Sequence, residues 1–375
     1  MNDAARDEPI VSRETFDGEE WLYFRALSPD VAIIRATTSD ERGNLGFEGE
    51  GAYLGAMEMA LAAHNAGGKV IAQVRRVAAN GSLRPHDVHV PGILVDMVVE
   101  APDMLQTTGT PYDPAISGEL IRPLDTFSVP AFGVQKVIAR RVARELRGGW
   151  AVNIGFGVSA NVPRIFLEEG CHGAVTWVIE QGAVGGIPLL DFKFGCASNA
   201  EAFVASPHQF AYFQAGGFDC SLLSFLEVGA DGSVNVSRLA ATPHRTAGAG
   251  GFVDITARAR RIVFSGTFEA GARMRIEDGR LVIDREGHTA KFVEAVDQVS
   301  YSGRRARAQG QEATYVTERC VIELREGGLT VTELAPGLDL ERDVLARAGT
   351  ALMVAPDLRE MEAALFAPGP IGLAP

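Results

Sequence analysis

The sequence has few of the residues on which metal sites and disulfide frameworks depend. Its four cysteines have no CxxC spacing, and its seven histidines form no HExxH or other paired-ligand pattern. We therefore expect neither a metal site nor a disulfide framework. No stretch approaches the roughly 20 apolar residues of a membrane span, and the polar, acidic start does not have the character of a signal peptide. These absences predict a cytoplasmic protein that does not contact a membrane.

Lysine is also scarce, and the excess of charge is negative. Only Lys69, Lys136, Lys193 and Lys291 are present, and the formal net charge is −13. An acidic chain argues against nucleic acid, whose phosphates demand a basic face. An anionic ligand must then be met locally, by arginine side chains or by helix N-termini.

The chain is long enough for two domains, since 375 residues of which 46% are hydrophobic can bury a large core. In the first part, patterns typical of strands at 21–27, 30–38 and 69–74 alternate with a helical pattern at 51–66. This alternation predicts a parallel sheet. Five prolines between residues 101 and 131 mark a connection. We therefore place the domains at 1–130 and 131–375.

The second part repeats the alternation of strand and helix. We expect helices at 134–146, 163–169 and 199–204, a helix beginning at Asp254, and a hairpin at 313–324. The strand at 149–158 runs into a glycine turn before the helix at 163–169. Such a turn is a candidate anion cradle, although a tight turn without a ligand fits the pattern equally well.

One stretch points to chemistry: Val175-Thr-Trp-Val-Ile-Glu180-Gln-Gly-Ala-Val-Gly-Gly-Ile-Pro188. A β-branched apolar run ends at Glu180 and breaks into glycines, so the carboxylate is expected where a buried strand turns. The carboxyl ends of parallel strands are where ligands bind, and the glycines allow a substrate to approach the backbone. A carboxylate that caps the turn or pairs with an arginine is the alternative.

A second glycine cluster, Gly248-Ala-Gly-Gly-Phe252, precedes the helix expected at Asp254. Two N–H groups projected by consecutive glycines can form an oxyanion hole. An ordinary flexible loop remains equally open from the pattern alone.

Several motifs in one order resemble the family I acyl-CoA:carboxylate CoA-transferases, especially the single-chain acetate and propionate enzymes related to succinyl-CoA:3-oxoacid CoA-transferase. The motifs cover nearly the whole chain: Ala32-Ile-Ile-Arg-Ala-Thr-Thr-Ser-Asp-Glu-Arg-Gly-Asn-Leu45, His89-Val-Pro-Gly-Ile-Leu-Val-Asp96, Glu180-Gln-Gly-Ala-Val-Gly-Gly-Ile-Pro188, Val234-Asn-Val-Ser237, Gly248-Ala-Gly-Gly-Phe252, Tyr315-Val-Thr-Glu-Arg-Cys-Val321 and Leu334-Ala-Pro-Gly-Leu-Asp-Leu340.

The resemblance implies two open, mostly parallel-sheet α/β domains with the active site between them. It implies that Glu180 is the nucleophile, that Gly250 and Gly251 are backbone oxyanion donors, and that Asn235 orients the glutamate. The resemblance further implies that one asparagine and four glycines bind the CoA substrate. They lie in the strand and turn at 149–158, in the turn after Glu180 and in the second glycine cluster: Asn153, Gly155, Gly157, Gly182 and Gly248.

The implied reaction is ping-pong transfer of CoA between short carboxylic acids through a glutamyl-CoA thioester on Glu180. Acyl-CoA and a small carboxylate are the expected partners, with CoA as substrate and no permanently bound cofactor. Two alternatives remain: an acyl-CoA hydrolase on the same scaffold, and a non-catalytic scaffold or partner subunit.

The resemblance also makes the first domain incomplete. Family members carry a long segment before the stretch that begins here near Phe16, and the first domain has few strands for a sheet covered on both faces. Three explanations remain open: a separate N-terminal polypeptide supplies the rest, this sequence is part of a longer chain, or a second copy of the chain covers the open edge. A separate N-terminal polypeptide or a second copy is the partner we expect. The activity of this chain alone is left open.

Overall fold

The structure is a computed structural model and describes residues 10–242, 244 and 246–375. It divides into two compact units, the first comprising Met1–Glu50 and Gly55–Gln106, the second Gly51–Leu54 and Thr107–Pro375. The boundary thus falls after Gln106, whereas the proline pattern places it after residue 130. Residues 107–130 belong to the second unit because they are bonded to it. The Asn199 N–H donates to Ala115 O, and the Arg122 N–H donates to Asn199 Oδ1.

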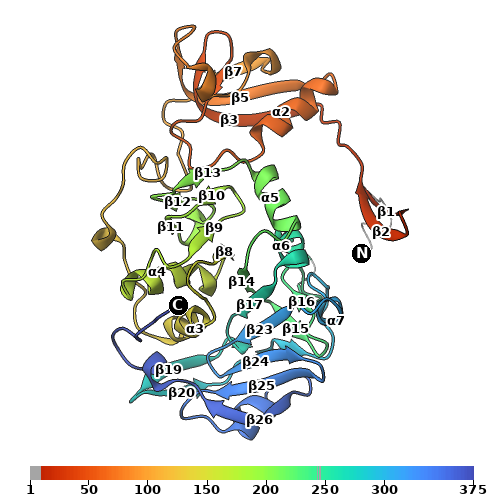
Figure 1. Ribbon diagram of the computed structural model, residues 1–375, viewed down its shortest axis with the longest axis vertical. Coiled ribbons are helices and arrows are strands. Elements are labelled where there is room, and N and C mark those ends of the chain that lie inside the picture. The colour runs from red at the N-terminus through yellow and green to blue at the C-terminus, as the bar shows by residue number, and fades with distance from the viewer. Residues whose placement is uncertain (1–9, 243, 245) are drawn as a thin grey trace. The chain divides into compact units, whose positions relative to one another are not determined.

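The first unit is built on a five-stranded sheet (Figure 1), in the order β6 (Val88–Val90), β4 (Leu45–Gly46), β3 (Val31–Asp40), β5 (Lys69–Ala78) and β7 (Met97–Glu100). The last three strands run parallel to one another, as the alternation of strand and helix predicts. A separate antiparallel hairpin precedes the sheet, formed by β1 (Val11–Phe16) and β2 (Glu19–Phe24).

Among the described residues of the unit, a helix covers one face of this sheet. Helix α2 (Ala56–Asn65) packs on β3 and β5, where Ala32, Ile34 and Ala36 are buried. The alternate residues of β3 point the other way, and Ile33 is 72% exposed. Because residues opposite one another in a sheet share a face, Met97 and Val99 of β7 extend the same apolar surface. We call this surface, made by Val31, Ile33, Met97 and Val99, the open face.

The second unit contains a ten-stranded sheet. Its strands lie in this order: β13 (Ala202–Phe203), β10 (Ala183–Val184), β9 (Thr176–Val178), β8 (Ala151–Ile154), β14 (Cys220–Ser224), β17 (Arg261–Ser265), β23 (Glu312–Val316), β24 (Cys320–Arg325), β25 (Gly328–Leu334) and β26 (Met353–Glu360). The central run from β9 to β23 is parallel throughout. Strands β23 and β24 form the antiparallel hairpin that the sequence predicts. The mostly parallel α/β architecture is therefore confirmed.

Helices cover both faces of the parallel run. One core joins α3 (Val134–Ala143) and α4 (Val162–Glu168) to β14 through Cys220 and Leu222. The other joins α5 (Ser206–Gln214) and α6 (Phe252–Arg258) to the same strand through Leu223. Successive residues of a strand point to opposite faces, so β14 separates the two cores.

The remaining elements are short. They are the strands β11 (Ile187–Pro188), β12 (Ala197–Ser198), β15 (Glu227–Gly229), β16 (Val234–Asn235), β18 (Glu269–Ala270), β19 (Arg273–Glu277), β20 (Arg280–Arg285), β21 (Thr289–Ala290) and β22 (Phe292–Val293), and the helix α7 (Gly303–Ala308). A π-helical turn at Glu341–Leu345 lies near the end of the chain.

The helix expected at 199–204 is wrong. Asn199 adopts a left-handed conformation with φ of 58°, and residues 202 and 203 form strand β13, which pairs antiparallel with β10. The pairing outweighs the helical propensity of the Ala and Glu residues, which is a weak local preference. The correction matters for the site, because β13 holds the turn that follows Glu180.

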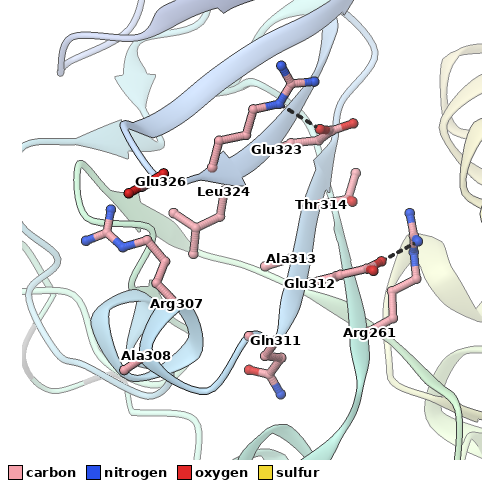
Figure 2. Close-up of a pocket in the computed structure, with 12 residues that line it drawn as sticks. Arg261, Arg307, Ala308, Gln311, Glu312, Ala313, Thr314, Glu323, Leu324 and Glu326 are labelled. Atoms are coloured by element: carbon pink, nitrogen blue, oxygen red, sulfur yellow. Dashed lines mark hydrogen bonds and ion pairs between the residues drawn. The ribbon is translucent and has the colours of Figure 1, made fainter.

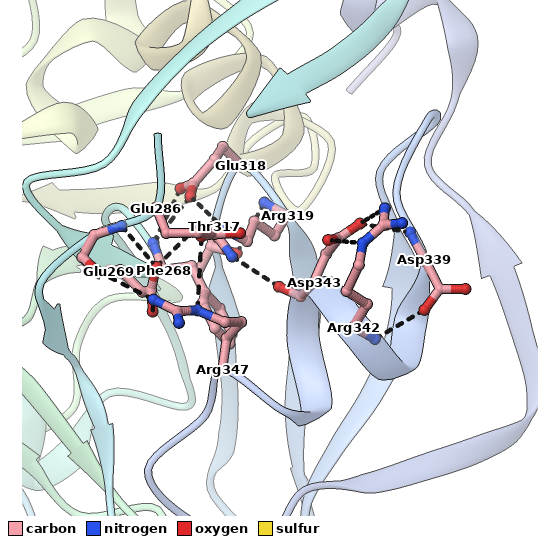
Figure 3. Close-up of polar contacts among 11 residues, drawn as sticks. Phe268, Glu269, Glu286, Thr317, Glu318, Arg319, Asp339, Arg342, Asp343 and Arg347 are labelled. Atoms are coloured by element: carbon pink, nitrogen blue, oxygen red, sulfur yellow. Dashed lines mark hydrogen bonds and ion pairs between the residues drawn. The ribbon is translucent and has the colours of Figure 1, made fainter. Parts of the chain in front are cut away.

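A network of buried ion pairs and hydrogen bonds connects the segment around Asp343 and Arg347 to Arg319, in the turn between β23 and β24 (Figure 3). Arg319, fully buried, donates to Glu269 at 3.0 Å, to Glu286 at 2.6 Å and to the Asp343 carbonyl at 2.8 Å. Arg347 also bonds Glu269, at 2.6 Å. These arginines satisfy carboxylates that would otherwise be costly to bury.

None of the four cysteines, all of them in the described part of the chain, forms a disulfide. Cys220 and Cys320 are fully buried. Burial raises the pKa of the Cys320 thiol to about 12, and it raises the pKa of Cys220 as well.

Candidate active site

Glu180 follows the carboxyl end of β9, at one edge of the parallel run. The pairing register of β8 with β9 shows how far along the strands Glu180 lies. Asn153 of β8 pairs with Val178 of β9, so Gly155 and Glu180, each two residues further along, reach the same edge on neighbouring strands. Parallel strands lie about 4.8 Å apart, which makes the turn after β8 the immediate neighbour of Glu180. The strand break expected from the sequence is confirmed.

The Glu180 carboxylate is partly buried and has few partners. Gln181 Nε2 donates to Glu180 Oε1 at 3.3 Å. No arginine or lysine forms an ion pair with Glu180 among the residues that the structure describes, so the arginine pair that the alternative interpretation includes is not seen there. Burial raises the pKa of the Glu180 carboxyl, and the negative charge of Asp254 raises it further. The site therefore holds a carboxylate that water solvates poorly.

A glycine sets the turn beyond Glu180. Gly182 has φ of 118°, and a Cβ at this position would overlap the carbonyl oxygen of Val204. The backbone of Val204 is held there by its N–H, which donates to Gly182 O at 2.8 Å. Only glycine permits this approach, because any other residue brings both strain and a steric clash. Gly182 therefore determines the shape of the turn, because it allows the backbone of Val204, the residue after β13, to pack against it.

The two glycine clusters meet at the carboxylate. A Cβ at Gly251 would lie 2.5 Å from Glu180 Oε2, so this carboxylate oxygen lies directly against the Gly251 backbone. Gly250, with φ of 53°, has open space on its side-chain face. Neither the Gly250 nor the Gly251 N–H donates to an acceptor in the described part of the chain. The sequence separates these clusters by about seventy positions, and the fold brings them into contact.

Helices α5 and α6 provide the rest of the wall. Phe210 of α5 lies 2.6 Å from the position of a Gly251 Cβ, so its ring occupies the space beside the glycine. Asp254 stands in the first turn of α6, and its Oδ1 accepts a 2.8 Å hydrogen bond from Gln214 Nε2. Ser206 Oγ donates to the Gln181 carbonyl at 3.2 Å. These contacts fasten the helices to the turn that carries Glu180.

Asn235 is buried in strand β16 and is bonded within its own turn. Its Nδ2 donates to Glu227 Oε2 at 2.7 Å and to the Arg238 carbonyl at 2.6 Å. Its Oδ1 accepts from the Ser237 N–H at 3.0 Å. No hydrogen bond joins Asn235 to Glu180 among the described residues. The side chain bonds Glu227 of β15 and the turn at 235–238 instead, and its predicted role toward the glutamate stays a prediction.

Asn153 is likewise buried, inside the sheet. Its Nδ2 donates to the Val178 carbonyl at 3.1 Å, and its Oδ1 accepts from Ser221 Oγ at 2.8 Å. The Asn153 side chain thus bonds β8 to both β9 and β14. Its partner on β9, Val178, lies two residues before Glu180. The predicted contact of Asn153 with CoA stays a prediction.

The other glycines predicted to bind CoA differ in their surroundings. A Cβ at Gly155 would lie 2.8 Å from Leu223 Cδ2, and Gly157 has φ of 111°. Both belong to the turn beside Glu180. Gly248 is exposed, and a Cβ there would lie no closer than 4.0 Å to the Gly250 nitrogen.

A further hollow of the second unit lies elsewhere (Figure 2). It measures about 800 Å³ and includes Arg261 and Glu312, the first residues of β17 and β23. Arg261 pairs with Glu312 at 2.6 Å, and Arg325 pairs with Glu323 at 3.0 Å. Glu180 lies at the carboxyl ends of the parallel strands, whereas Arg261 and Glu312 lie at their amino ends. This hollow therefore takes no part in the candidate site.

Three neighbours of Glu180 were not singled out from the sequence: Gln181, Phe210 and Asp254. Of the three, only Gln181 could have been found from the sequence, because it is the residue next to Glu180. Phe210 and Asp254 are brought in by helix packing, which local patterns do not encode. No group of three or more metal-ligating side chains occurs within the described residues. No helix in the same part of the chain combines the length and apolarity needed to cross a membrane.

Comparison with known proteins gives one consistent family. The family described as Coenzyme A transferase matches residues 7–101. The chain is 41% identical to the caffeate CoA-transferase of Acetobacterium woodii, over 96% of this chain and 70% of that protein. It is 36% identical to the acetate CoA-transferase YdiF of Escherichia coli (strain K12), over 99% of this chain and 70% of that protein.

Solved structures agree with the sequence matches. The crystal structure of the acyl-CoA transferase YdiF apoenzyme from Escherichia coli O157:H7 is similar with a TM-score of 0.90 at 36% identity, over 98% of this chain and 69% of that chain. A crystal structure of its thioester complex with CoA has the same TM-score of 0.90.

Proposed function

Because the chain belongs to the CoA-transferases that act between acyl-CoA and carboxylates, we propose that Glu180 is its nucleophile and that CoA is carried as a thioester on this side chain. The observation that carries the proposal is the contact between Glu180 Oε2 and Gly251, beside two N–H groups without a described acceptor. The relative that forms a thioester complex with CoA supports it.

The proposed reaction begins with attack of a Glu180 oxygen on the thioester carbonyl of an acyl-CoA. The carbon–sulfur bond breaks, giving an acyl–glutamyl anhydride and CoA thiolate. The thiolate then attacks the glutamyl carbonyl and expels the first carboxylate, which leaves glutamyl-CoA. A second carboxylate reverses both steps and departs as its CoA thioester. Neither ATP nor water is consumed.

The glycine N–H groups have a defined task in this scheme. Negative charge develops on the carbonyl oxygen in each tetrahedral intermediate, and N–H donors aimed at it lower the barrier. Gly250 and Gly251 are the proposed donors. Gly155, Gly157, Gly182 and Gly248 remain proposed determinants of CoA binding or turn shape. For Asn153 and Asn235, the hydrogen bonds described above favour a role in holding the fold.

We propose acetate and propionate as the simplest acids, because the resemblance implies them and one relative is an acetate CoA-transferase. No permanently bound cofactor enters the scheme. The cytoplasmic location and the interdomain placement of the site stay predictions. The partner polypeptide or second copy also stays a prediction, which the open face of the first unit supports.

Borohydride trapping tests the nucleophile. The protein is incubated with acetyl-CoA and reduced, and peptide mass spectrometry locates the change. Reduction is expected at Glu180, with CoA transfer to [¹⁴C]acetate in unreduced samples. The Glu180→Gln variant is expected to lose trapping and to lower kcat by about 10⁴-fold or more, the scale set by losing a nucleophile in other enzymes. Trapping at another residue would contradict the assignment.

The same experiment separates the hydrolase alternative. A hydrolase steadily releases free CoA from acetyl-CoA in the absence of any acceptor acid. A transferase without acceptor instead releases acetate, only up to the amount of enzyme, and keeps CoA as the thioester on Glu180. A steady release without acceptor would therefore replace the transferase with a hydrolase that uses the same carboxylate.

A further inference from the structure

A pocket of about 270 Å³ adjoins the turn after β8, beside the candidate nucleophile. Its lining comes from that turn, from the start of α3 and from the segment after β11: Gln135, Phe156, Gly157, Val158, Ala160, Asn161, Leu190 and Asp191. The register that places Gly155 beside Glu180 also places Phe156 and Gly157 at this edge of the sheet.

A chain of contacts leads from the carboxylate to the pocket. Gln181, which donates to Glu180 Oε1, packs its side chain 3.1 Å from the position of a Gly195 Cβ. Phe194, the residue before Gly195, meets Phe156 edge to face, with ring centroids 6.0 Å apart. Two intervening contacts thus separate the Glu180 carboxylate from the Phe156 ring that lines the pocket.

The walls are mainly apolar and aromatic. Val158, Ala160 and Leu190 provide aliphatic surface, and the Phe156 ring is 56% exposed. An exposed ring held by a backbone contact is a ready surface for stacking: Ser224 Oγ donates to the Phe156 carbonyl at 3.1 Å. Gln135 and Asn161 add neutral hydrogen-bonding groups. The lining thus favours an uncharged chain, aromatic or aliphatic.

The pocket has one charged side chain, and its sign is negative. Asp191 is exposed and adopts φ of 55°, a conformation that side chains other than Gly, Asn and Asp rarely take. Lys193 lies two residues further, is exposed, and is not part of the lining. A second carboxylate on the substrate would meet Asp191 with like charge, which costs binding energy.

We propose that this pocket holds the chain of the transferred acid and selects monocarboxylates larger than acetate, aromatic ones in particular, against dicarboxylates. The inference rests on the proposed function of Glu180 and names the substrate class for it. A volume of 270 Å³ equals the share of about nine water molecules in the liquid, far more than a methyl group fills. A phenylpropanoic chain matches it better than acetate does.

The test measures kcat/KM for four acceptors with acetyl-CoA as donor: acetate, butanoate, 3-phenylpropanoate and succinate. Each buried methylene is worth about 0.8 kcal/mol, a factor of about four, so 3-phenylpropanoate is expected to exceed acetate by at least tenfold. Succinate is expected to be the poorest acceptor. Equal or greater kcat/KM for acetate or succinate overturns the inference.

Three variants assign the selectivity to the pocket. Phe156→Ala is expected to lower the ratio of 3-phenylpropanoate to acetate by about tenfold, since it removes the stacking surface. Asp191→Asn keeps the shape and the left-handed backbone, and is expected to raise the ratio of succinate to 3-phenylpropanoate several-fold. Lys193→Ala is the matched control, expected to leave both ratios as in the parent chain. If Phe156→Ala and Asp191→Asn also leave both ratios unmoved, the pocket does not hold the acid.

Trapping at Glu180 keeps the two proposals apart. Trapping with acetyl-CoA, accompanied by transfer to acetate but none to larger acids, would overturn the pocket inference and leave the nucleophile standing. Absence of trapping and of transfer to every acid would overturn the proposed function itself, and the pocket inference with it.

Discussion

At the Glu180 carboxyl, burial and the charge of Asp254 act in the same direction. Both raise its pKa above the ordinary value of 4.5, burial more than Asp254. The nucleophile must be ionised, so activity is expected to fall as the pH drops through this raised pKa. Above it, the carboxylate is charged and poorly solvated, which favours attack on a carbonyl carbon.

Replacing Asp254 tests this account. Asp254→Asn removes the repelling charge and keeps an oxygen for the bond from Gln214. The pKa of Glu180 is then expected to decrease, so the acid limb of the kcat profile moves to lower pH. Asp254→Glu keeps the charge and should leave the limb close to its original position. If the acid limb of the kcat profile lies at the same pH in Asp254→Asn as in the parent chain, a group other than Glu180 limits the rate at low pH.

Gly251 is where a side chain would interfere most directly with the carboxylate. The Cβ of Gly251→Ala would lie 2.5 Å from Glu180 Oε2 and 2.6 Å from the Phe210 ring, so the loop must shift. Misplacing one oxyanion donor costs on the order of 10²–10³ in kcat.

A second glycine gives the control for this variant. Gly173 is exposed, has no atom within 4 Å of a Cβ position, and precedes β9 at the opposite end of that strand. Gly173→Ala is expected to keep parental kinetics, and circular dichroism checks that both variants fold. Parental kcat in Gly251→Ala would remove the oxyanion role from this loop.

Among the elements, β8 and β9 depend on one buried amide. Asn153 bonds the Val178 carbonyl and Ser221 Oγ from inside the sheet, so Asn153→Ala leaves buried polar atoms without partners. We expect a loss of about 1–3 kcal/mol in the free energy of unfolding, measured by urea denaturation. The exposed Gln309→Ala variant should change it by less than about 0.5 kcal/mol. A stable Asn153→Ala protein with raised KM for acyl-CoA would instead restore the predicted substrate contact.

The elements around Glu180 show what a sequence can and cannot predict. The strand that ends at Glu180 was predictable, since a β-branched run followed by glycines has a local cause. The meeting of Glu180 with Gly251 was expected only through family resemblance, because no local pattern links residues so far apart. The strand at Ala202–Phe203 was missed because its pairing with β10 is a tertiary effect. Asn153 and Asn235 were predicted as site residues through the same resemblance, which does not reveal the partners they bond.

For the whole molecule, the open face of the first unit predicts association. Ile33 is 72% exposed on a surface that continues through Met97 and Val99 of β7, and such apolar surface favours a protein partner. Sedimentation velocity of the chain alone is expected to show concentration-dependent self-association. Ile33→Lys should weaken it, while Val299→Lys, at an exposed loop position of the second unit, should not. A monomer at every concentration would leave a separate polypeptide as the partner to seek.

The two buried cysteines have a practical consequence for the test of the hydrolase alternative. Thiol reagents react with thiolates, and Cys220 and Cys320 are both enclosed and held protonated. A disulfide dye such as 5,5′-dithiobis(2-nitrobenzoate) should therefore detect CoA freed by hydrolysis, with background in the native protein confined to Cys171 and Cys196. Transfer between acids leaves CoA as a thioester and gives no colour. Adding denaturant should then expose the two silent thiols, so one cuvette can report both hydrolysis and the fraction of enzyme still folded.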